Sequence, residues 1–253
     1  MSSDIWLKAI AGAGFAAIAV GLSIRYRLGH GREIAIATIR AFVQLAAVGG
    51  LIALVFRFPG LALVFVAAMV ATASLTAGSR LRGLPGARVR ALVSIALPAL
   101  AATAVLLAIG AFAFTPRAAV PTAGILVGGA MTATTLTGRR LLESLRDDVP
   151  EIETRLALGD TARTALAPAI RRAVHTGLVP VIDQTRSVGL VTLPGTFVGL
   201  ILGGATPAEA AATQLVVLLA LMAVELGAGL LLAELTQRAV ILPGERVLLL
   251  VIN

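Results

Sequence analysis

The chain has 253 residues, of which 58% are hydrophobic and only 13% are charged, and its mean hydropathy is +0.97. A soluble domain has about 45–50% apolar residues, so this composition excludes a water-soluble globular protein. The 21 basic residues outnumber the 13 acidic ones and give a formal net charge of +8. Such an excess is typical of nucleic-acid binding or of the cytoplasmic loops of a membrane protein, and its placement decides between them.

Seven apolar stretches are long enough to cross a membrane, since about 20 helical residues span a hydrocarbon core of roughly 30 Å. None of them alternates as a membrane β-barrel strand does. We therefore predict an all-α, multi-pass membrane protein with a single transmembrane domain over 1–253. Its spans are expected near 5–24, 34–56, 61–78, 91–114, 119–138, 187–204 and 210–233.

The arginines indicate an orientation. The first stretch is followed by positive charges rather than preceded by them, so it reads as an uncleaved span and not as a signal peptide. Alternate loops and the C-terminal tail carry sixteen arginines, whereas the opposite side carries only Lys8, Arg57 and Arg117. The positive-inside rule then places the N-terminus outside and the C-terminus in the cytoplasm. The basic excess reflects topology, and we expect no nucleic-acid partner. The sixteen arginines on the side assigned to the cytoplasm are Arg25, Arg27, Arg32, Arg80, Arg82, Arg88, Arg90, Arg139, Arg140, Arg146, Arg155, Arg163, Arg171, Arg172, Arg238 and Arg246.

Residues that carry chemistry are scarce. Cysteine is absent, and His30 and His175 are the only histidines, so disulfides, thiolate metal sites and a cysteine nucleophile are excluded. The phosphate-binding pattern GxxxxGK[ST] and the catalytic patterns HExxH and GxSxG are also missing. A retinal protein would need a lysine in its last span, and the only lysine is Lys8. We therefore expect no enzyme, no catalytic residue and no cofactor bound by this chain.

One long connection, 139–186, is expected on the cytoplasmic side, with acidic residues among its arginines and room for helices on the inner surface. Within it, the stretch from Glu153 through Leu158 and Gly159, followed by Pro168, resembles the EAA-type loop of ABC transporter permeases. In that superfamily the loop forms a short helix that couples to the ATPase subunit. An amphipathic helix on the inner surface would explain the same pattern.

A larger set of motifs is similar to the FetB-type (YbbM-like) family of ABC permeases, from about Arg40 to Ala233. The set comprises Arg40-Ala-Phe-Val-Gln44-Leu, Leu156-Ala-Leu-Gly159, the run from Asp183 to Gly195, and Gln214. These are small bacterial membrane subunits implicated in iron export, with plant relatives in aluminium tolerance.

The resemblance implies a permease in a bacterial inner membrane that exports a metal ion, which is iron in the family's case. Its partners would be a separate cytoplasmic ATPase subunit, which binds ATP and Mg, a second copy of the permease, and the lipid bilayer.

Several polar residues are candidates for a transport pathway. Arg40 and Gln44 share a helix face, because they are four residues apart. Polar groups inside a span commonly face a cavity, although Arg40 at a span end could reach the interface and Gln44 could make one interhelical hydrogen bond. Asp183 and Arg186, three residues apart and flanking Thr185, are expected at the cytoplasmic entrance of the sixth span. They would form either a structural ion pair or part of an inner gate.

Prolines and glycines around the sixth span predict a kink and close packing. Pro180 and Pro194 each remove a backbone hydrogen bond and favour a kink. Gly195, Gly199 and Gly203 form a ridge at four-residue spacing, which suits dimerisation or packing within the chain.

Glu225 falls in the middle of the last span and Gln214 near its start. An acid at this depth is a candidate functional group that could bind a cation, relay a proton or pair with Arg40. The resemblance does not extend to Glu225. Any metal site would be rich in oxygen, from Glu225, Asp183, Gln44 and threonines, which suits hard cations.

Three alternatives remain open from the sequence. The chain could be a permease of the same architecture for another solute, such as a nucleotide sugar or a lipid. It could be an intramembrane enzyme, although it lacks a paired-carboxylate or nucleophile motif. It could also be a membrane scaffold without transport activity.

Overall fold

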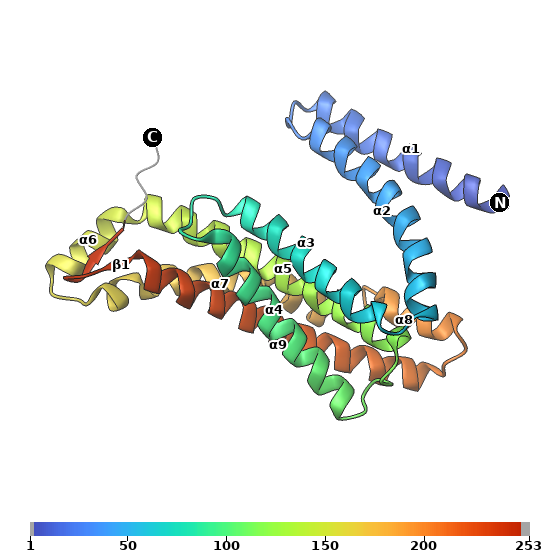
Figure 1. The fold of residues 1–253 in the computed structure, drawn as a ribbon. Coiled ribbons are helices and arrows are strands. Elements are labelled where there is room, and N and C mark those ends of the chain that lie inside the picture. The colour runs from blue at the N-terminus through green and yellow to red at the C-terminus, as the bar shows by residue number, and fades with distance from the viewer. Residues whose placement is uncertain (1–2, 249–253) are drawn as a thin grey trace. The chain divides into compact units, whose positions relative to one another are not determined.

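The computed structural model describes residues 3–248 and divides into two compact units, Met1–Pro59 and Gly60–Asn253. Residues 1–2 and 249–253, which belong to the domain expected over 1–253, lie outside the described residues. Both units consist of helices, and the second also has a two-stranded hairpin near its C-terminal end (Figure 1). The predicted all-α fold class is confirmed.

The first unit is a hairpin of helices α1 (Ser3–Arg25) and α2 (Gly31–Arg57). Gly29 adopts a φ of +76° in the turn between them, where an L side chain would be strained. Large apolar side chains, among them Trp6, Phe15 and Phe42, are exposed along both helices. Helices that are apolar on every side suit lipid rather than water.

The second unit contains the remaining elements. They are α3 (Leu61–Arg80), α4 (Ala87–Ala108), α5 (Pro116–Asp147), α6 (Val149–Ala157), α7 (Ala162–Ser187), α8 (Gly195–Leu202), α9 (Pro207–Val240), β1 (Ile241–Leu242) and β2 (Arg246–Val247). Helix α5 is central, because it packs against α3, α4, α7 and α9. The short helix α6 lies at one end of this bundle with the β-hairpin, and α8 lies at the other (Figure 1).

Small residues allow the central helices to approach one another. A Cβ atom on Gly138 of α5 would stand 2.6 Å from a methyl carbon of Leu81, and one on Gly177 of α7 would overlap the Thr137 hydroxyl. Around these contacts lie two apolar clusters. One includes Ile95 and Leu126 in the middle of the bundle, and the other surrounds the α6 end.

Within the described residues, six helices are long and apolar enough to cross a membrane: α1 (from Trp6), α2, α3, α4, α5 and α9. They match six of the seven predicted spans. Helix α9 begins where the sequence provides a capping box: Thr206 accepts from the backbone N–H of Glu209, and the Glu209 carboxylate accepts from that of Thr206.

The predicted span over 187–204 is wrong. Helix α8 covers only eight residues of it, which is about 12 Å of helix. A turn with Gly189 at φ +81° precedes α8, and Gly204 at φ +94° follows it. Pro194, which lacks a backbone N–H, stands at the N-cap of α8 rather than inside a continuous helix.

The predicted loop 139–186 is also organised differently. Helix α5 continues to Asp147, and α7 is a helix of 26 residues that packs against α5 and α9. Its buried positions recur at helical spacing, with Leu166, Ala169, Ala173, Gly177 and Val181 facing the bundle. At 1.5 Å per residue α7 is about 39 Å long, enough to run the depth of a membrane.

Candidate functional site

The corner between α5 and α7 is built around the short helix α6. Pro150 occupies its first turn, where a missing backbone N–H costs nothing. Ile152 is buried and anchors α6 in the apolar cluster at this end of the bundle. Gly159 then reverses the chain with a φ of +95°, and the Thr161 side chain accepts from the Thr164 backbone N–H to begin α7.

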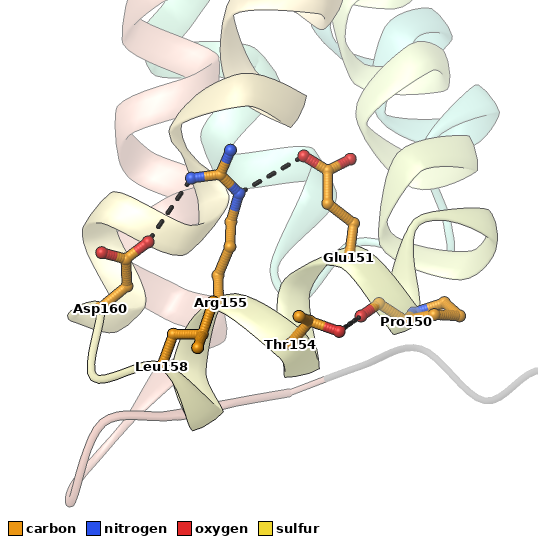
Figure 2. Close-up of a pocket in the computed structure, with 6 residues that line it drawn as sticks. All are labelled: Pro150, Glu151, Thr154, Arg155, Leu158 and Asp160. Carbon is orange, nitrogen blue, oxygen red and sulfur yellow. Dashed lines mark hydrogen bonds and ion pairs between the residues drawn. The ribbon is translucent and has the colours of Figure 1, made fainter.

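The outer side of α6 presents a shallow surface hollow (Figure 2). Its lining residues are Pro150, Glu151, Thr154, Arg155, Leu158 and Asp160. Leu158 is 82% exposed, and it lines the hollow together with the charged side chains of Glu151, Arg155 and Asp160. The site therefore combines one protruding apolar side chain with charged neighbours, as a protein-docking surface does.

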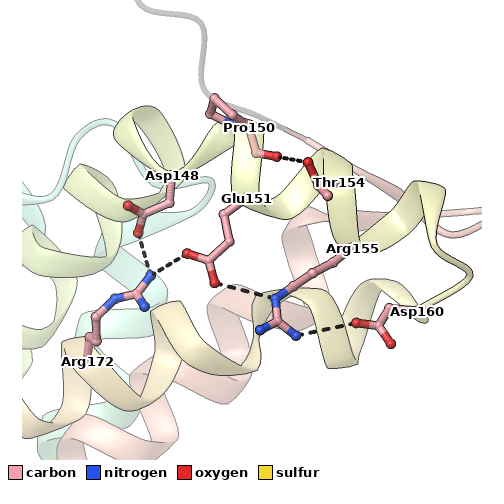
Figure 3. Close-up of polar contacts among 7 residues, drawn as sticks. All are labelled: Asp148, Pro150, Glu151, Thr154, Arg155, Asp160 and Arg172. Atoms are coloured by element: carbon pink, nitrogen blue, oxygen red, sulfur yellow. Dashed lines mark hydrogen bonds and ion pairs between the residues drawn. The ribbon is translucent and has the colours of Figure 1, made fainter.

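A chain of ion pairs ties this corner together (Figure 3). Arg172 of α7 donates to Asp148 at 2.8 Å and to Glu151 at 3.5 Å. Arg155 lies 3.4 Å from Glu151 on one side and 3.4 Å from Asp160 on the other. The two arginines thus link the end of α5, helix α6 and the turn before α7.

Asp148 is held in its ionised form. Partial burial alone would raise its pKa, but the hydrogen bond and charge of Arg172, together with the charge of Arg140, outweigh burial and leave the pKa below its ordinary value. The carboxylate therefore stays charged at neutral pH and available to Arg172.

The end of α9 and the β-hairpin brace the same corner from behind. The backbone N–H of Ala162 donates to the Glu245 carboxylate at 2.6 Å. Arg163 donates to Glu234 at 2.9 Å, and the Gln237 side chain donates to the Arg163 carbonyl at 3.1 Å. The turn between α6 and α7 is therefore held by contacts with α9 and the β-hairpin as well as by contacts with the end of α5.

Of the coupling residues expected from the sequence, three lie together at this corner. Glu153 and Leu158 are exposed, and Gly159 forms the turn. Pro168 lies one to two turns into α7 and is half-buried.

The expected pathway residues fall into separate places. Arg40 and Gln44 are exposed on α2 of the first unit. Asp183 and Arg186 are exposed, with Oδ1 and Nη1 4.0 Å apart, and Thr185 donates to the Val181 carbonyl. Since 21 residues of α7 separate Ala162 from Asp183, the pair lies about 30 Å along the helix from the α6 corner, not beside it as expected.

Gln214 and Glu225 are the two expected residues that the structure buries, at 6% and 5% exposure on α9. An oxygen of each has no hydrogen-bond partner among the described residues. No three His, Cys, Asp or Glu side chains within the described part of the chain gather as metal ligands would.

The expected packing residues surround α8 and the end of α7. Pro180 is exposed inside α7. A Cβ atom on Gly195 or Gly199 would meet nothing within 4 Å, and one on Gly203 would meet only carbonyls of its own helix. Contact of this ridge with a second chain stays a prediction. Close contacts between helices occur instead at other glycines, among them Gly129, Gly138 and Gly177, which were not predicted from the sequence.

The ion pairs at the α6 corner were not predicted from the sequence either. They join Asp148, Glu151, Arg155 and Arg172. A signal for one pair was present, since Glu151 and Arg155 are four residues apart in the order that favours a helix. The link from Arg172 to Asp148 joins residues 24 apart and has no local signature.

Comparison with known proteins places this architecture in context. The model of the uncharacterised protein family UPF0014 matches residues 6–241. The UPF0014 membrane protein STAR2 of Oryza sativa subsp. japonica is 42% identical over 218 residues, covering 85% of this chain and 76% of that protein. The protein ALUMINUM SENSITIVE 3 of Arabidopsis thaliana is 37% identical, covering 79% and 74%.

A bacterial relative is named for transport. The probable iron export permease protein FetB of Escherichia coli strain K12 is 31% identical over 202 residues, which are 79% of this chain and 78% of that protein. No solved structure matches.

Proposed function

The chain belongs to the UPF0014 family of membrane proteins, and from this membership we propose that it is the membrane-spanning permease subunit of an ATP-driven transporter. The family resemblance drawn from the sequence is confirmed, since a FetB permease is among the relatives. The observation that carries the proposal is the braced helix α6 with Leu158 exposed at the end of α5 and α7.

Helix α6 is the docking site for a separately encoded ATPase subunit that binds ATP and Mg. It carries the exposed Leu158 at its end and is joined by ion pairs of Arg172 to α7 and to Asp148 at the end of α5. Helix α7 is joined in turn to α9 through Arg163 and Glu234. A displacement of α6 on ATPase binding would therefore be transmitted to the central helices α5, α7 and α9.

The α6 end faces the cytoplasm. The arginines of α6, of the first half of α7 and of the tail lie at this end, as the positive-inside rule requires. Helix α7 then makes the sixth crossing in place of 187–204. Seven crossings leave the N-terminus outside, and the membrane is the inner membrane of a bacterium.

The cargo is a metal ion, by extension from the name of the FetB relative, and the direction is export. The buried polar groups of α9, Gln214 and Glu225, lie on the route, and Arg40, Gln44, Asp183, Thr185 and Arg186 contribute at the surfaces of the two units. The working transporter contains two permease chains and two ATPase chains.

Co-purification tests the docking site. A tagged chain is solubilised in mild detergent together with a candidate ABC ATPase subunit, and the bound ATPase is quantified. Leu158→Glu is expected to reduce the bound ATPase at least tenfold, because it places a charge at the centre of an apolar contact.

Leu190→Glu is the matched control. Leu190 is 91% exposed but lies beyond the far end of α7, so this variant should retain the ATPase. Equal binding by both variants, or no ATPase bound to the unaltered chain, would contradict the proposal.

A further inference from the structure

Glu225 is a buried acid of the second unit, and its Oε2 atom is without a partner in the part of the chain that the structure describes. Its side chain lies near the middle of α9 and is 5% exposed. The Oε2 atom has no hydrogen-bond partner among the described residues. Buried polar groups are nearly always paired, so an orphaned carboxyl oxygen needs an explanation.

A glycine on α5 makes room for this carboxyl group. A Cβ atom on Gly129 would stand 2.7 Å from Oε1 of Glu225 and would overlap a methyl carbon of Leu221. The backbone of α5 therefore approaches the carboxyl group closely, and any larger residue at 129 would displace it.

No charged group of the neighbouring helices can serve as a counter-ion. Residues 61–79 of α3, 91–108 of α4, 118–138 of α5 and 195–202 of α8 contain no Asp, Glu, Lys, Arg or His. Arg90 at the start of α4 donates to the Leu235 carbonyl, which is ten residues, about 15 Å, along α9 from Glu225. On α7, His175 is exposed, and Asp183 and Arg186 are exposed and pair with each other. The nearest acids on α9 itself, Glu209 and Glu234, are more than two turns away. Glu209 is paired with Thr206, and Glu234 with Arg163 and Arg238.

A charged carboxylate in an apolar surrounding without a counter-ion is strongly disfavoured relative to the neutral acid. A proton is also the one cation that needs no cavity. The closed seam between α5 and α9 therefore suits a protonated Glu225.

The same seam has a second unpartnered oxygen. The Thr137 hydroxyl of α5 has no hydrogen-bond partner within residues 3–248 and would lie 3.1 Å from a Cβ atom on Gly229, one turn beyond Glu225 on α9. Oxygen donors of this kind suit hard cations. Separation of α5 from α9 would expose both oxygens.

We propose that Glu225 is a proton-binding site at which an oxygen-preferring cation exchanges for a proton. In the closed seam the carboxyl group is neutral. When α5 and α9 separate, the O–H bond breaks, the proton passes to water, and the carboxylate oxygens contact the cation. Release of the cation reverses these steps. This inference rests on the proposed function, because the cation is the cargo.

Infrared spectroscopy and proton release test the exchange on the full chain in nanodiscs, without an ATPase. At neutral pH the unaltered chain should show a protonated-carboxyl band that Glu225→Gln lacks. Excess Fe²⁺ under argon should remove the band and release about one proton per chain, whereas Glu225→Gln should release none.

Matched variants test whether the band and the proton release come from Glu225. Glu209→Gln changes an exposed acid of the same helix and should keep both the band and the proton release. Glu225→Asp should shift the band instead of removing it, which assigns the band even if the glutamine variant fails to fold. Gly129→Ala should also shift the band, since it displaces the carboxyl group.

An unaltered chain without a band that depends on residue 225 overturns the proposal, and so does a band that Fe²⁺ leaves unchanged. Because no ATPase is present, these results are independent of the docking test at Leu158. A chain that binds no ATPase yet releases the proton would contradict the proposed function and not the proton site.

Discussion

Asp148 joins two helices through one hydrogen-bonded charge. Its carboxylate closes the end of α5, stands at the N-cap of α6 and accepts from Arg172 of α7 at 2.8 Å. A negative charge at a helix start is also favoured by the helix dipole. The side chain is 25% exposed and Arg172 is 40% exposed, so solvent weakens the pair without removing it.

Asp148→Asn is expected to lower the free energy of unfolding by about 1 kcal/mol at neutral pH, the upper range for a partly exposed pair. Because the pKa of Asp148 is lowered in the folded protein, its stabilisation is complete above the ordinary value of 3.8 and is lost as the pH falls through the lowered pKa. The difference between the two chains should therefore be constant above about pH 5 and shrink in stronger acid.

Thermal unfolding in detergent at several pH values measures this difference. Asp183→Asn is the control, because its pair with Arg186 is 4.0 Å long and exposed on both sides, and it should change stability by less than about 0.5 kcal/mol. If Asp148→Asn remained equally destabilised in acid, the charge of Asp148 would not be the cause of the lost stability.

Some of the site residues could be predicted from the sequence and others could not. Leu158 and Gly159 were identifiable, because a turn and a flanking apolar residue are local features. The fit of Glu225 against Gly129 was not, since these residues are 96 positions apart and meet only when α5 and α9 pack.

Among the elements, the β-hairpin has a larger effect than its four strand residues suggest. Glu245 in its turn accepts from the Ala162 backbone N–H, one of the donors that the start of α7 leaves without a partner inside the helix. Ile241 and Val247 pack against the apolar cluster that contains Ile152 of α6. The hairpin therefore holds α6 and α7 in register with the end of α9.

Glu245→Ala is expected to remove the hydrogen-bond acceptor of the Ala162 backbone N–H and so to increase local opening at the start of α7. Loss of a capping acceptor costs about 0.5–2 kcal/mol, so amide hydrogen exchange over residues 158–166 should accelerate by roughly tenfold. Hydrogen exchange followed by mass spectrometry measures the rate for that peptide.

Glu245→Gln provides the comparison, because its amide oxygen can still accept the hydrogen bond from Ala162. Exchange in this variant should stay within about threefold of the unaltered chain. Equal acceleration in both variants would assign the effect to charge instead of capping, and no acceleration in either would show that the hairpin does not brace α7.

Helix α7 shows why one element was missed. Its inner face has the spacing of a buried helix, but Arg171, Arg172 and His175 lower its average hydropathy below that of a span. The stretch 187–204 has the opposite property, being apolar but interrupted by Gly189, Pro194 and Gly204. A composition window therefore favoured a segment that forms no long helix, whereas the periodicity of the buried positions predicts the long helix that the structure shows.

At the scale of the whole molecule, the chain is a multi-pass membrane protein whose central bundle contains polar groups and whose first unit exposes apolar side chains. The arginine distribution and the family were accessible from the sequence, because both depend on residue order alone. Which side each end of the bundle faces depends on whether α7 crosses the membrane.

The absence of cysteine from the chain makes that question directly testable. Leu158→Cys places a thiol beside α6, and Leu190→Cys places one just beyond the other end of α7. Both positions are more than 80% exposed in the unaltered chain. If α7 crosses, a membrane-impermeant maleimide applied to spheroplasts should label Leu190→Cys and leave Leu158→Cys unlabelled until the cells are lysed.

Inverted membrane vesicles should reverse this pattern, with Leu158→Cys labelled and Leu190→Cys protected, and the unaltered chain should stay unlabelled throughout. If α7 lay on the inner surface, both cysteines would react from the same side in each preparation. The two positions are separated by a helix about 39 Å long, which exceeds the roughly 30 Å hydrocarbon core. Opposite labelling therefore requires that α7 cross the bilayer.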